Sequence, residues 1–140
     1  MVSDRRRHRY RCFPTSGSFS NGQCAYTYLG SNVASYLASY QAKLGDGTDL
    51  MSMCNILNNS TGTGAQTAIN NIFSVDSFWR DAAVMNALTN TDSFLGSGKD
   101  HYLYHDNVYG QFHTFPFDLN EALAGSTWLS MWYNTTLATR

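Results

Sequence analysis

Residues 101–119 read HYLYHDNVYGQFHTFPFDL, and this stretch carries the clearest fold signal in the sequence. Aromatic or apolar residues alternate with polar ones on both sides of HDNVYG, which predicts two antiparallel strands joined by a turn. Pro116 lacks a backbone N–H donor, so we expect the second strand to lie at a sheet edge or to end there. We expect Phe115 and Phe117 to anchor this strand in the core, with Asp118 placed at its end.

Upstream of the hairpin, the spacing of apolar residues favours helices. One is predicted over residues 32–44, capped by Ser31 and stopped by the GDG at 45–47, and a second begins after a Thr48 cap. Further helices are predicted over 65–73 and 77–89, and a short strand over 24–30. The buried sides of the second helix and of the 77–89 helix are expected to comprise Leu50, Met51, Met53, Cys54 and Leu57, and Phe78, Ala82, Met85, Ala87 and Leu88. This order predicts a mostly helical α+β fold with one hairpin.

Composition limits the chain to one domain, since 140 residues with 43% hydrophobic content suffice for a single core. Five of the nine Lys and Arg residues lie in the first eleven positions. We expect residues 1–23 to be a basic, disordered segment, because chain ends are commonly poorly ordered. The acid-rich remainder argues against a nucleic-acid partner. The absence of a run of about 20 apolar residues argues against a membrane span.

Cysteine and histidine give weak signals for metal or redox chemistry. The spacing of Cys12, Cys24 and Cys54 matches no zinc pattern; a Cys12–Cys24 disulfide stays open, whereas Cys54 is expected in the core. His105 and His113 are expected to face each other across the hairpin, where solvated side chains are favoured over a metal site.

Two aspartates stand out by their positions. Asp92 lies in the loop after the 77–89 helix, and Asp118 ends the hairpin. A helix, an aspartate loop, a hairpin and a terminal aspartate follow one another in this order in the large lobe of protein kinases. There the first aspartate orients the attacking hydroxyl and the second holds Mg²⁺. Taken alone, the spacing favours a structural role, because aspartates are common at turns and caps.

The neighbouring sequence changes this balance. In order along the chain stand YLG (28–30), NVASYLASYQAKLGDGTDL (32–50), MCNILNN (53–59), VDSFWRDAAVMNALTNTDS (75–93) and the hairpin with its terminal aspartate. Together they resemble the C-terminal half of the CotH spore-coat kinase-like family, over residues 26–125. The resemblance implies that Asp92 is the catalytic-loop aspartate and Asp118 a metal ligand. Asp100 stands where the family has a metal-facing asparagine, and Asn120 where it has a second aspartate.

The function that this resemblance implies is phosphotransfer. Intact relatives would use Mg²⁺ and ATP to phosphorylate Ser or Thr hydroxyls of a coat or surface protein, at the cell or spore surface. No apolar segment follows the N-terminal arginines, so no secretory signal peptide is predicted.

The sequence departs from a complete kinase in one respect. No glycine-rich, lysine-bearing unit precedes the resemblance, neither Lys43 nor Lys99 is predicted on a strand, and the GDG is a helix stop rather than a phosphate loop. We therefore expect a large-lobe fragment without the N-terminal lobe: a partial domain over 24–125, a tail over 126–140, and little activity alone. The alternative is a non-catalytic secreted or surface interaction module.

Overall fold

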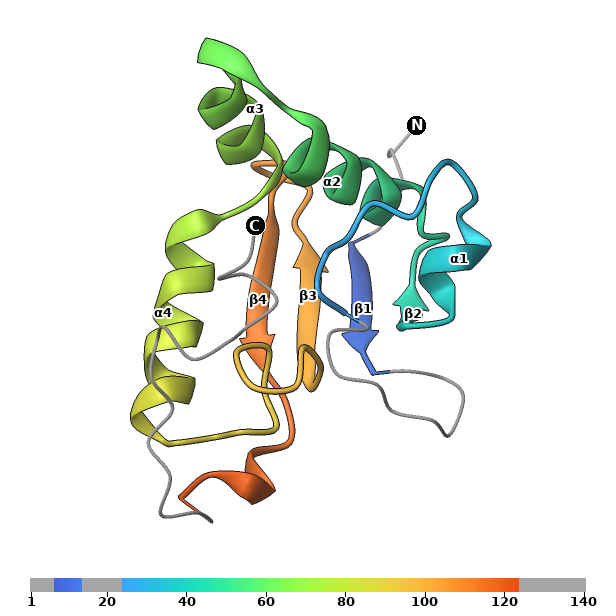
Figure 1. Ribbon diagram of the computed structural model, residues 1–140. Helices are drawn as coiled ribbons and strands as arrows, with labels where there is room; N and C mark the ends of the chain where they lie inside the picture. Colours follow the sequence, from blue (N-terminus) through green and yellow to red (C-terminus); the bar gives the residue numbers. More distant parts are fainter. Residues whose placement is uncertain (1–6, 14–23, 124–140) are drawn as a thin grey trace.

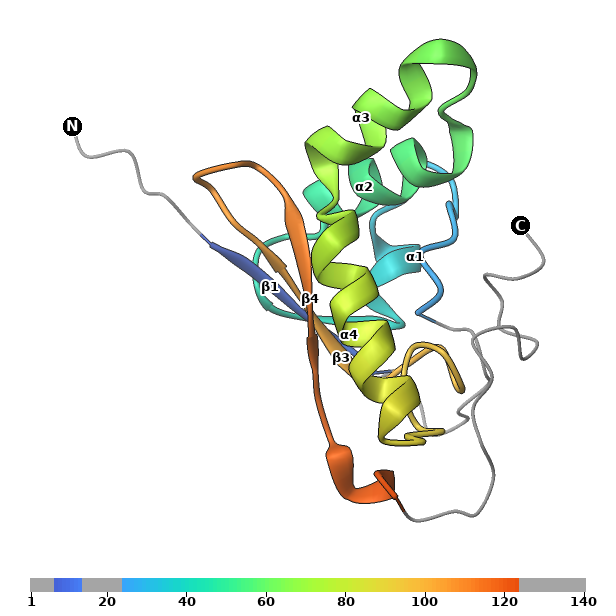
Figure 2. The ribbon, with the colours of Figure 1, turned by 90° about the vertical axis from the view of Figure 1, so that its left-hand side faces the viewer.

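The computed structural model describes residues 7–13 and 24–123, and these form an α+β fold (Figure 1). Four strands, β1 (His8–Cys12), β2 (Tyr40–Leu44), β3 (His101–His105) and β4 (Phe112–Pro116), build one antiparallel sheet in the order β2-β1-β3-β4. The helices are α1 (Ala34–Leu37), α2 (Thr48–Asn59), α3 (Ala65–Ile72) and α4 (Val75–Ala87), with 3-10 turns η1 (Gly62–Gly64) and η2 (Leu119–Glu121). In Figure 2 the sheet is seen nearly edge-on, with the helices on one side of it.

The predicted hairpin is confirmed as β3 and β4, with His101 opposite Pro116 and Tyr104 opposite His113. β4 lies at the edge of the sheet, as Pro116 indicated. The prediction that Phe115 anchors the strand in the core is wrong, because this side chain is 50% exposed. Side chains alternate between the two faces of a strand, and in this register it is Phe112 and Thr114 that face the core.

The basic N-terminal stretch supplies a central strand. The expectation of disorder is therefore wrong for His8–Cys12, which form β1 between β2 and β3. Tyr10 and Cys12 are fully buried, while Arg9 and Arg11 alternate with them and lie over aromatic rings. The Arg11 guanidinium lies 4.3 Å from the ring centroids of both Phe13 and Phe117. Two arginines of the charge run thus belong to the outer face of the sheet.

The predicted helix over 32–44 is wrong in its second half. Helix α1 ends at Leu37, and β2 begins at Tyr40, which pairs with Cys12 of β1. Ser31 is not the cap, since Val33 precedes the first helical residue, and the described residues of 24–30 form no strand. Strand pairing with β1 supplies the backbone partners that an extended α1 would have provided internally.

The glycine pair of the GDG turns the chain from β2 into α2. Gly45 and Gly47 have φ values of 110° and 89°, a region that glycine enters without a Cβ penalty. Gly47 precedes the first helical residue, and it is the Asp46 carboxylate that accepts the Thr48 N–H, at 3.0 Å. The predicted Thr48 cap is therefore wrong, although the start of the helix is confirmed.

The core lies between the sheet and α2 and α4. Most predicted inner residues are buried there, among them Leu50, Met53, Cys54, Phe78, Ala82 and Met85, whereas Ala87 is exposed and Leu88 only partly covered. Burial of each such Leu, Met or Phe side chain stabilises the folded chain by about 1.5–3 kcal/mol relative to an exposed side chain. The three cysteines are buried thiols, so the Cys12–Cys24 disulfide is not formed. No helix within the described ranges is long and apolar enough to cross a membrane.

Candidate functional site

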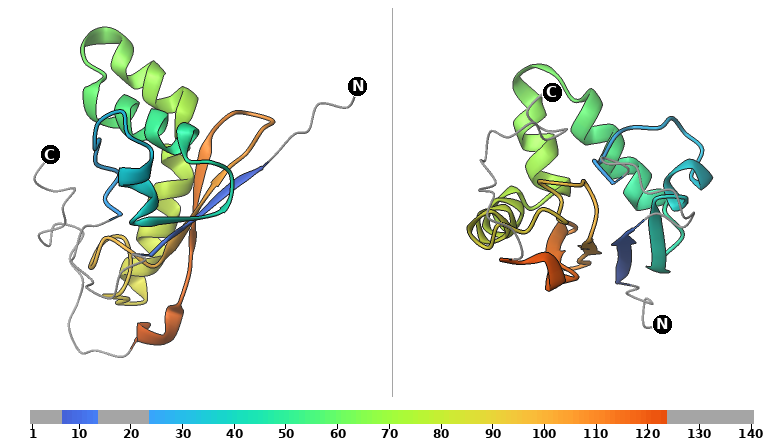
Figure 3. Two further views of the ribbon diagram at one scale, coloured as in Figure 1. Left: turned by 90° about the vertical axis from the view of Figure 1, so that its right-hand side faces the viewer. Right: turned by 60° about the horizontal axis from the view of Figure 1, so that its bottom comes forward.

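The loop between α4 and β3, residues 88–100, is fixed by its own hydrogen bonds. The Ser93 carbonyl accepts the N–H groups of Ser97 (2.9 Å) and Gly98 (3.0 Å), and the Ser93 hydroxyl donates to the Asn90 carbonyl (2.7 Å). A side chain at Gly96 would collide with the Thr91 carbonyl. The loop predicted after the 77–89 helix is thus confirmed, and it is closed by hydrogen bonds within the segment (Figure 3, left).

This loop brings Asp92 and Asp100 together around Lys99. The Lys99 ammonium donates to Asp92 Oδ1 and to Asp100 Oδ2. The side chains of Asp92, Lys99 and Asp100 are 33%, 12% and 1% exposed, so the cluster opens to solvent on the Asp92 side. The backbone N–H of Asp100 donates to the Cys12 carbonyl of β1 at 2.8 Å, which joins the cluster to the sheet.

The charges within this Asp92–Lys99–Asp100 cluster are strongly linked. Burial raises the pKa of Asp100, and the neighbouring Asp92 carboxyl raises it further. The Lys99 ammonium acts to lower this pKa but does not outweigh the other two effects. Burial also acts to raise the pKa of Asp92, but hydrogen bonds from Lys99, Asp100 and Ser97 outweigh it and lower that pKa. Burial would lower the pKa of Lys99, yet its hydrogen bonds to both carboxyls raise it. Lys99 is therefore charged and Asp92 ionised at neutral pH.

One oxygen of the cluster lacks a partner among the described residues. Asp100 Oδ1 is buried and accepts no hydrogen bond from residues 7–13 or 24–123. An unpaired buried acceptor costs about 1–3 kcal/mol unless something else satisfies it. A hard cation such as Mg²⁺ takes carboxylate oxygens as ligands, so a carboxylate oxygen here, beside a second carboxylate, fits the metal that the sequence implies.

Asp118 and Asn120 are placed differently. Asp118 is exposed, with a left-handed φ of 56°, and precedes η2, which contains the exposed Asn120. His101 at the start of β3 pairs with Pro116 at the end of β4. Asp100, just before β3, and Asp118, just after β4, therefore lie at the same end of the hairpin. Among the described residues, no hydrogen bond or ion pair joins Asp118 or Asn120 to Asp92 or Asp100. The structure thus brings together two of the four predicted site residues.

Lys99 is the member of the cluster that the sequence did not assign. As expected, Lys99 lies in a loop and not on a strand. The same expectation is wrong for Lys43, which lies on β2 and donates a hydrogen bond to Gln41 on the surface. The adjacency of Lys99 to Asp100 was the available signal. An isolated Lys–Asp pair in a sequence is too common to single out without the backbone that folds Asp92 toward it.

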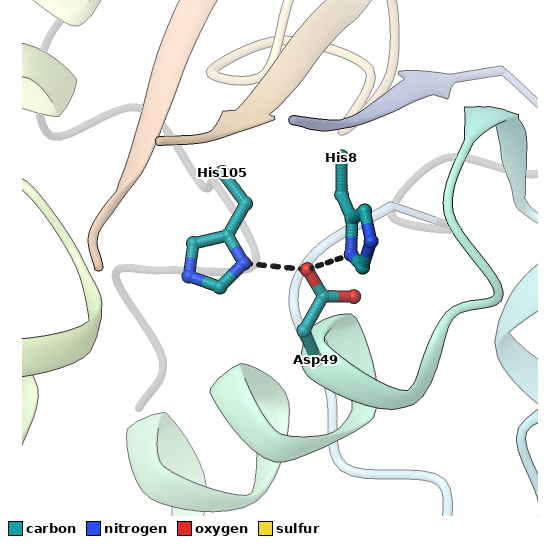
Figure 4. Close-up of side chains that lie close together, drawn as sticks. All are labelled: His8, Asp49 and His105. Carbon is teal, nitrogen blue, oxygen red and sulfur yellow. Dashed lines mark hydrogen bonds and ion pairs between the residues drawn. The ribbon is translucent and has the colours of Figure 1, made fainter. Parts of the chain in front are cut away.

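The predicted His105–His113 pair is wrong. His105 lies opposite Phe112, and His113 bonds Asp106 at 3.2 Å. On its other side, β3 pairs His105 with His8 of β1, and both imidazoles point at the Asp49 carboxylate (Figure 4). Burial opposes ionisation of Asp49, but hydrogen bonds from His105, Tyr10 and His8 hold its pKa at about 2.

A shallow cavity of about 500 Å³ lies between α4 and β4, with Ser77, Asp81, His113 and Thr114 among its lining residues. Burial raises the pKa of Asp81 to about 6, and in the part of the chain that the structure describes Asp81 Oδ1 has no hydrogen-bond partner. Sequence reasoning assigned Asp81 only to the helix and missed this environment, which depends on how α4 packs against β4.

The model of the family described as CotH kinase protein matches residues 19–137 of this chain. This region includes Asp92, Lys99, Asp100, Asp118 and Asn120, and it begins after β1. No curated protein matches the sequence significantly.

Proposed function

Because the chain belongs to the CotH kinase protein family, we propose that its acidic cluster serves phosphotransfer from ATP to a Ser or Thr hydroxyl of a protein substrate. The observation that carries this proposal is the buried, unpartnered Oδ1 of Asp100 beside Asp92 and Lys99. Phosphotransfer depends on positioned groups and charge neutralisation, which a fixed acidic loop next to a lysine can provide.

In this proposal each side chain has a separate role. Asp100 holds Mg²⁺ through its Oδ1, with Asp118 and Asn120, which follow β4 at the same end of the hairpin, as further oxygen ligands. The ion, when bound, supplies positive charge to the phosphates. Asp92, whose pKa is lowered, accepts a hydrogen bond from the acceptor hydroxyl and orients it. Lys99 keeps Asp92 ionised and adds a positive charge near the phosphates.

Binding of nucleotide is the sharper readout, because we expect slow transfer by the chain alone. Within 7–13 and 24–123, no glycine-rich turn leads into a lysine-bearing strand that would cover the phosphates. Calorimetric titration with ATP should show binding that requires Mg²⁺. We expect Asp100→Ala, which removes the side-chain oxygens, to weaken it by about tenfold or more, through the loss of one charge-assisted contact.

The matched control is Asp76→Ala, which changes an exposed aspartate of α4 that pairs with Arg80 on the surface. It should bind Mg²⁺–ATP like the unmodified chain. Equal binding by the Asp100→Ala and control variants would contradict the metal role of Asp100. In a full-length relative, radiolabelled ATP should show transfer that is lost when the residue aligned with Asp92 or Asp118 is changed.

A non-catalytic surface module is the second candidate, and one observation favours it. Lys99 already pairs with both carboxylates, so the cluster can serve only to fasten the 88–100 loop to the start of β3. In that case Mg²⁺ and ATP would give no heat of binding, and Asp100→Ala would change the free energy of unfolding without changing any ligand affinity.

A further inference from the structure

Three side chains from three elements meet at the other end of β3 from the Asp92–Lys99–Asp100 cluster. His8 begins β1, His105 ends β3 and Asp49 lies in the first turn of α2 (Figure 4). The strand rise puts the two ends of β3 about 13 Å apart. This group is therefore separate from the proposed phosphotransfer site, and nothing in the proposed function uses it.

The nitrogens of both imidazoles converge on one carboxylate oxygen. Nδ1 of His8 lies 2.8 Å and Nδ1 of His105 lies 2.6 Å from Asp49 Oδ2. The three atoms all lie within 4.8 Å of one another. The side chains of His8, Asp49 and His105 are 23%, 13% and 22% exposed, so a small ion can reach them while the protein shields most of the site.

Contacts around the three side chains fix their orientation. The Tyr10 hydroxyl donates to Asp49 Oδ1, which leaves Oδ2 to face the histidines, and the Gly47 N–H donates to the same hydroxyl at 3.2 Å. The His105 ring stacks on Phe112, with centroids 4.3 Å apart and planes 6° apart, and it also hydrogen-bonds the Gly110 backbone. Partners of this kind orient the ligands in protein metal sites.

We propose that His8, Asp49 and His105 bind a divalent transition-metal ion of the Zn²⁺ type. Two imidazoles and one carboxylate form a known ligand set for Zn²⁺ that leaves a fourth position for water or another ligand. Mg²⁺ prefers oxygen ligands throughout, so the two ends of β3 select different ions. Binding replaces the two hydrogen bonds to Oδ2: each imidazole coordinates through an unprotonated Nδ1 and carries its single proton on Nε2. A neutral ring with the proton on Nδ1 changes tautomer, and an imidazolium releases its Nδ1 proton to solvent.

The ligands come from β1, β3 and α2, so the ion would link the N-terminal strand to the rest of the fold. His8 and Tyr10 precede residue 19, where the family match begins. The site is therefore a property of this chain with its N-terminal strand rather than of the matched region. An ion that binds only the folded chain raises the melting temperature with its concentration.

Calorimetric titration of the metal-stripped, reduced chain with ZnCl₂ tests the proposal. We expect one ion per chain with a dissociation constant on the order of 1 μM or tighter. His8→Ala and His105→Ala should each weaken binding by more than about 100-fold, and Tyr10→Phe, which removes an outer contact, by about 10–100-fold. In a titration with MgCl₂, these substitutions should not change the binding, because Mg²⁺ should not bind at the two histidines. The control His113→Ala, at a histidine bound to Asp106, should bind Zn²⁺ like the unmodified chain.

Nitrogen NMR of the unmodified chain keeps the test valid if a variant fails to fold. On addition of ZnCl₂, the Nδ1 resonances of His8 and His105 should shift, while those of His101 and His113 stay in place. The proposal is overturned if the unmodified chain binds no Zn²⁺ in this range, if binding survives the loss of both His8 and His105, or if the shifts appear at other histidines or at the cysteines.

Discussion

His101 is a histidine that the fold keeps neutral. It is 1% exposed, with Nε2 at 2.7 Å from the Tyr26 hydroxyl and Nδ1 at 3.2 Å from the Lys99 carbonyl. A carbonyl only accepts, so Nδ1 carries the proton and Nε2 accepts from Tyr26. Burial lowers the pKa of His101 to about 4, although the hydrogen bond to the Lys99 carbonyl opposes this shift.

Acid should therefore destabilise the fold through His101. Below about pH 6.5 the unfolded chain binds a proton at this ring, and the folded chain does so only near pH 4. The contribution of His101 to the free energy of unfolding is fully present above pH 6.5, and it falls by up to about 3 kcal/mol as the pH drops to 4. His101→Gln should be less stable at pH 7, with a difference from the unmodified chain that shrinks toward pH 4. Urea unfolding across this range measures it; a difference that stays constant with pH would contradict the assignment.

Asp81 has the opposite effect on stability. Burial raises its pKa to about 6 in the folded chain, against about 4 when unfolded, so its contribution is full below pH 4 and is lost as the pH rises through 6. Asp81→Asn removes a poorly solvated charge and should stabilise the chain by about 1–2 kcal/mol at pH 7 but not at pH 4. Thermal unfolding at the two pH values tests this, with Asp76→Asn on the exposed side of α4 as the neutral control.

At the scale of elements, the spacing of apolar and turn residues correctly predicted those helices and strands that are stabilised by contacts between neighbouring parts of the chain. Helices α2, α3 and α4 and the β3–β4 hairpin follow from apolar spacing and turn residues, and all four were predicted within a few residues. The face predicted for β4 is wrong, because Phe115 lies on the opposite side of the strand from the buried Phe112 and Thr114. The alternative alternation, through Phe112 and Thr114, packs the strand against α4.

Strands β1 and β2 could not be predicted this way, because each is stabilised by partners distant in the chain. The residues of β2 have helical apolar spacing, and only pairing with β1 makes them extended. In β1, the alternation of Tyr10 and Cys12 with Arg9 and Arg11 was a strand signal that the charge run concealed. Distance along the chain also concealed the His8–His105 pair. The Lys99 contacts are local, but they depend on how the 88–100 loop folds Asp92 toward Lys99.

Gly45 is a glycine that the turn between β2 and α2 requires. Its φ is 110°, and a Cβ would lie 2.7 Å from His8 Cγ and 2.9 Å from the Tyr10 hydroxyl. Gly45→Ala should therefore cost about 3 kcal/mol or more, by backbone strain and by displacing His8 and Tyr10. Gly30→Ala is the matched control: its φ is 85° but nothing lies within 4 Å of the added Cβ, so about 1 kcal/mol is expected. Urea unfolding of both variants measures the difference, and equal losses would rule out the steric contribution.

For the whole molecule, the sheet depends on β1, which pairs along its length with both β2 and β3. Arg9→Pro would remove a backbone donor from the middle of this central strand. We expect loss of cooperative unfolding and of the near-ultraviolet circular dichroism of the buried tyrosines. Arg9→Ala keeps the backbone donor and should fold normally. A cooperative, folded Arg9→Pro chain would show that β1 is dispensable, contrary to its position in the sheet.

The position of β1 between β2 and β3 also sets an order of events during synthesis. β2 follows β1 closely along the chain, but the partner of His8 in β3 is His105, about 97 residues later. At ribosomal speed this interval lasts about 5–20 s. Until β3 has been synthesised, one edge of β1 has no strand partner, and the inward-facing Tyr10 and Cys12 are not yet buried. In the nascent chain this edge is a ready acceptor for a foreign strand, so the growing polypeptide needs a chaperone or a dilute environment until β3 emerges.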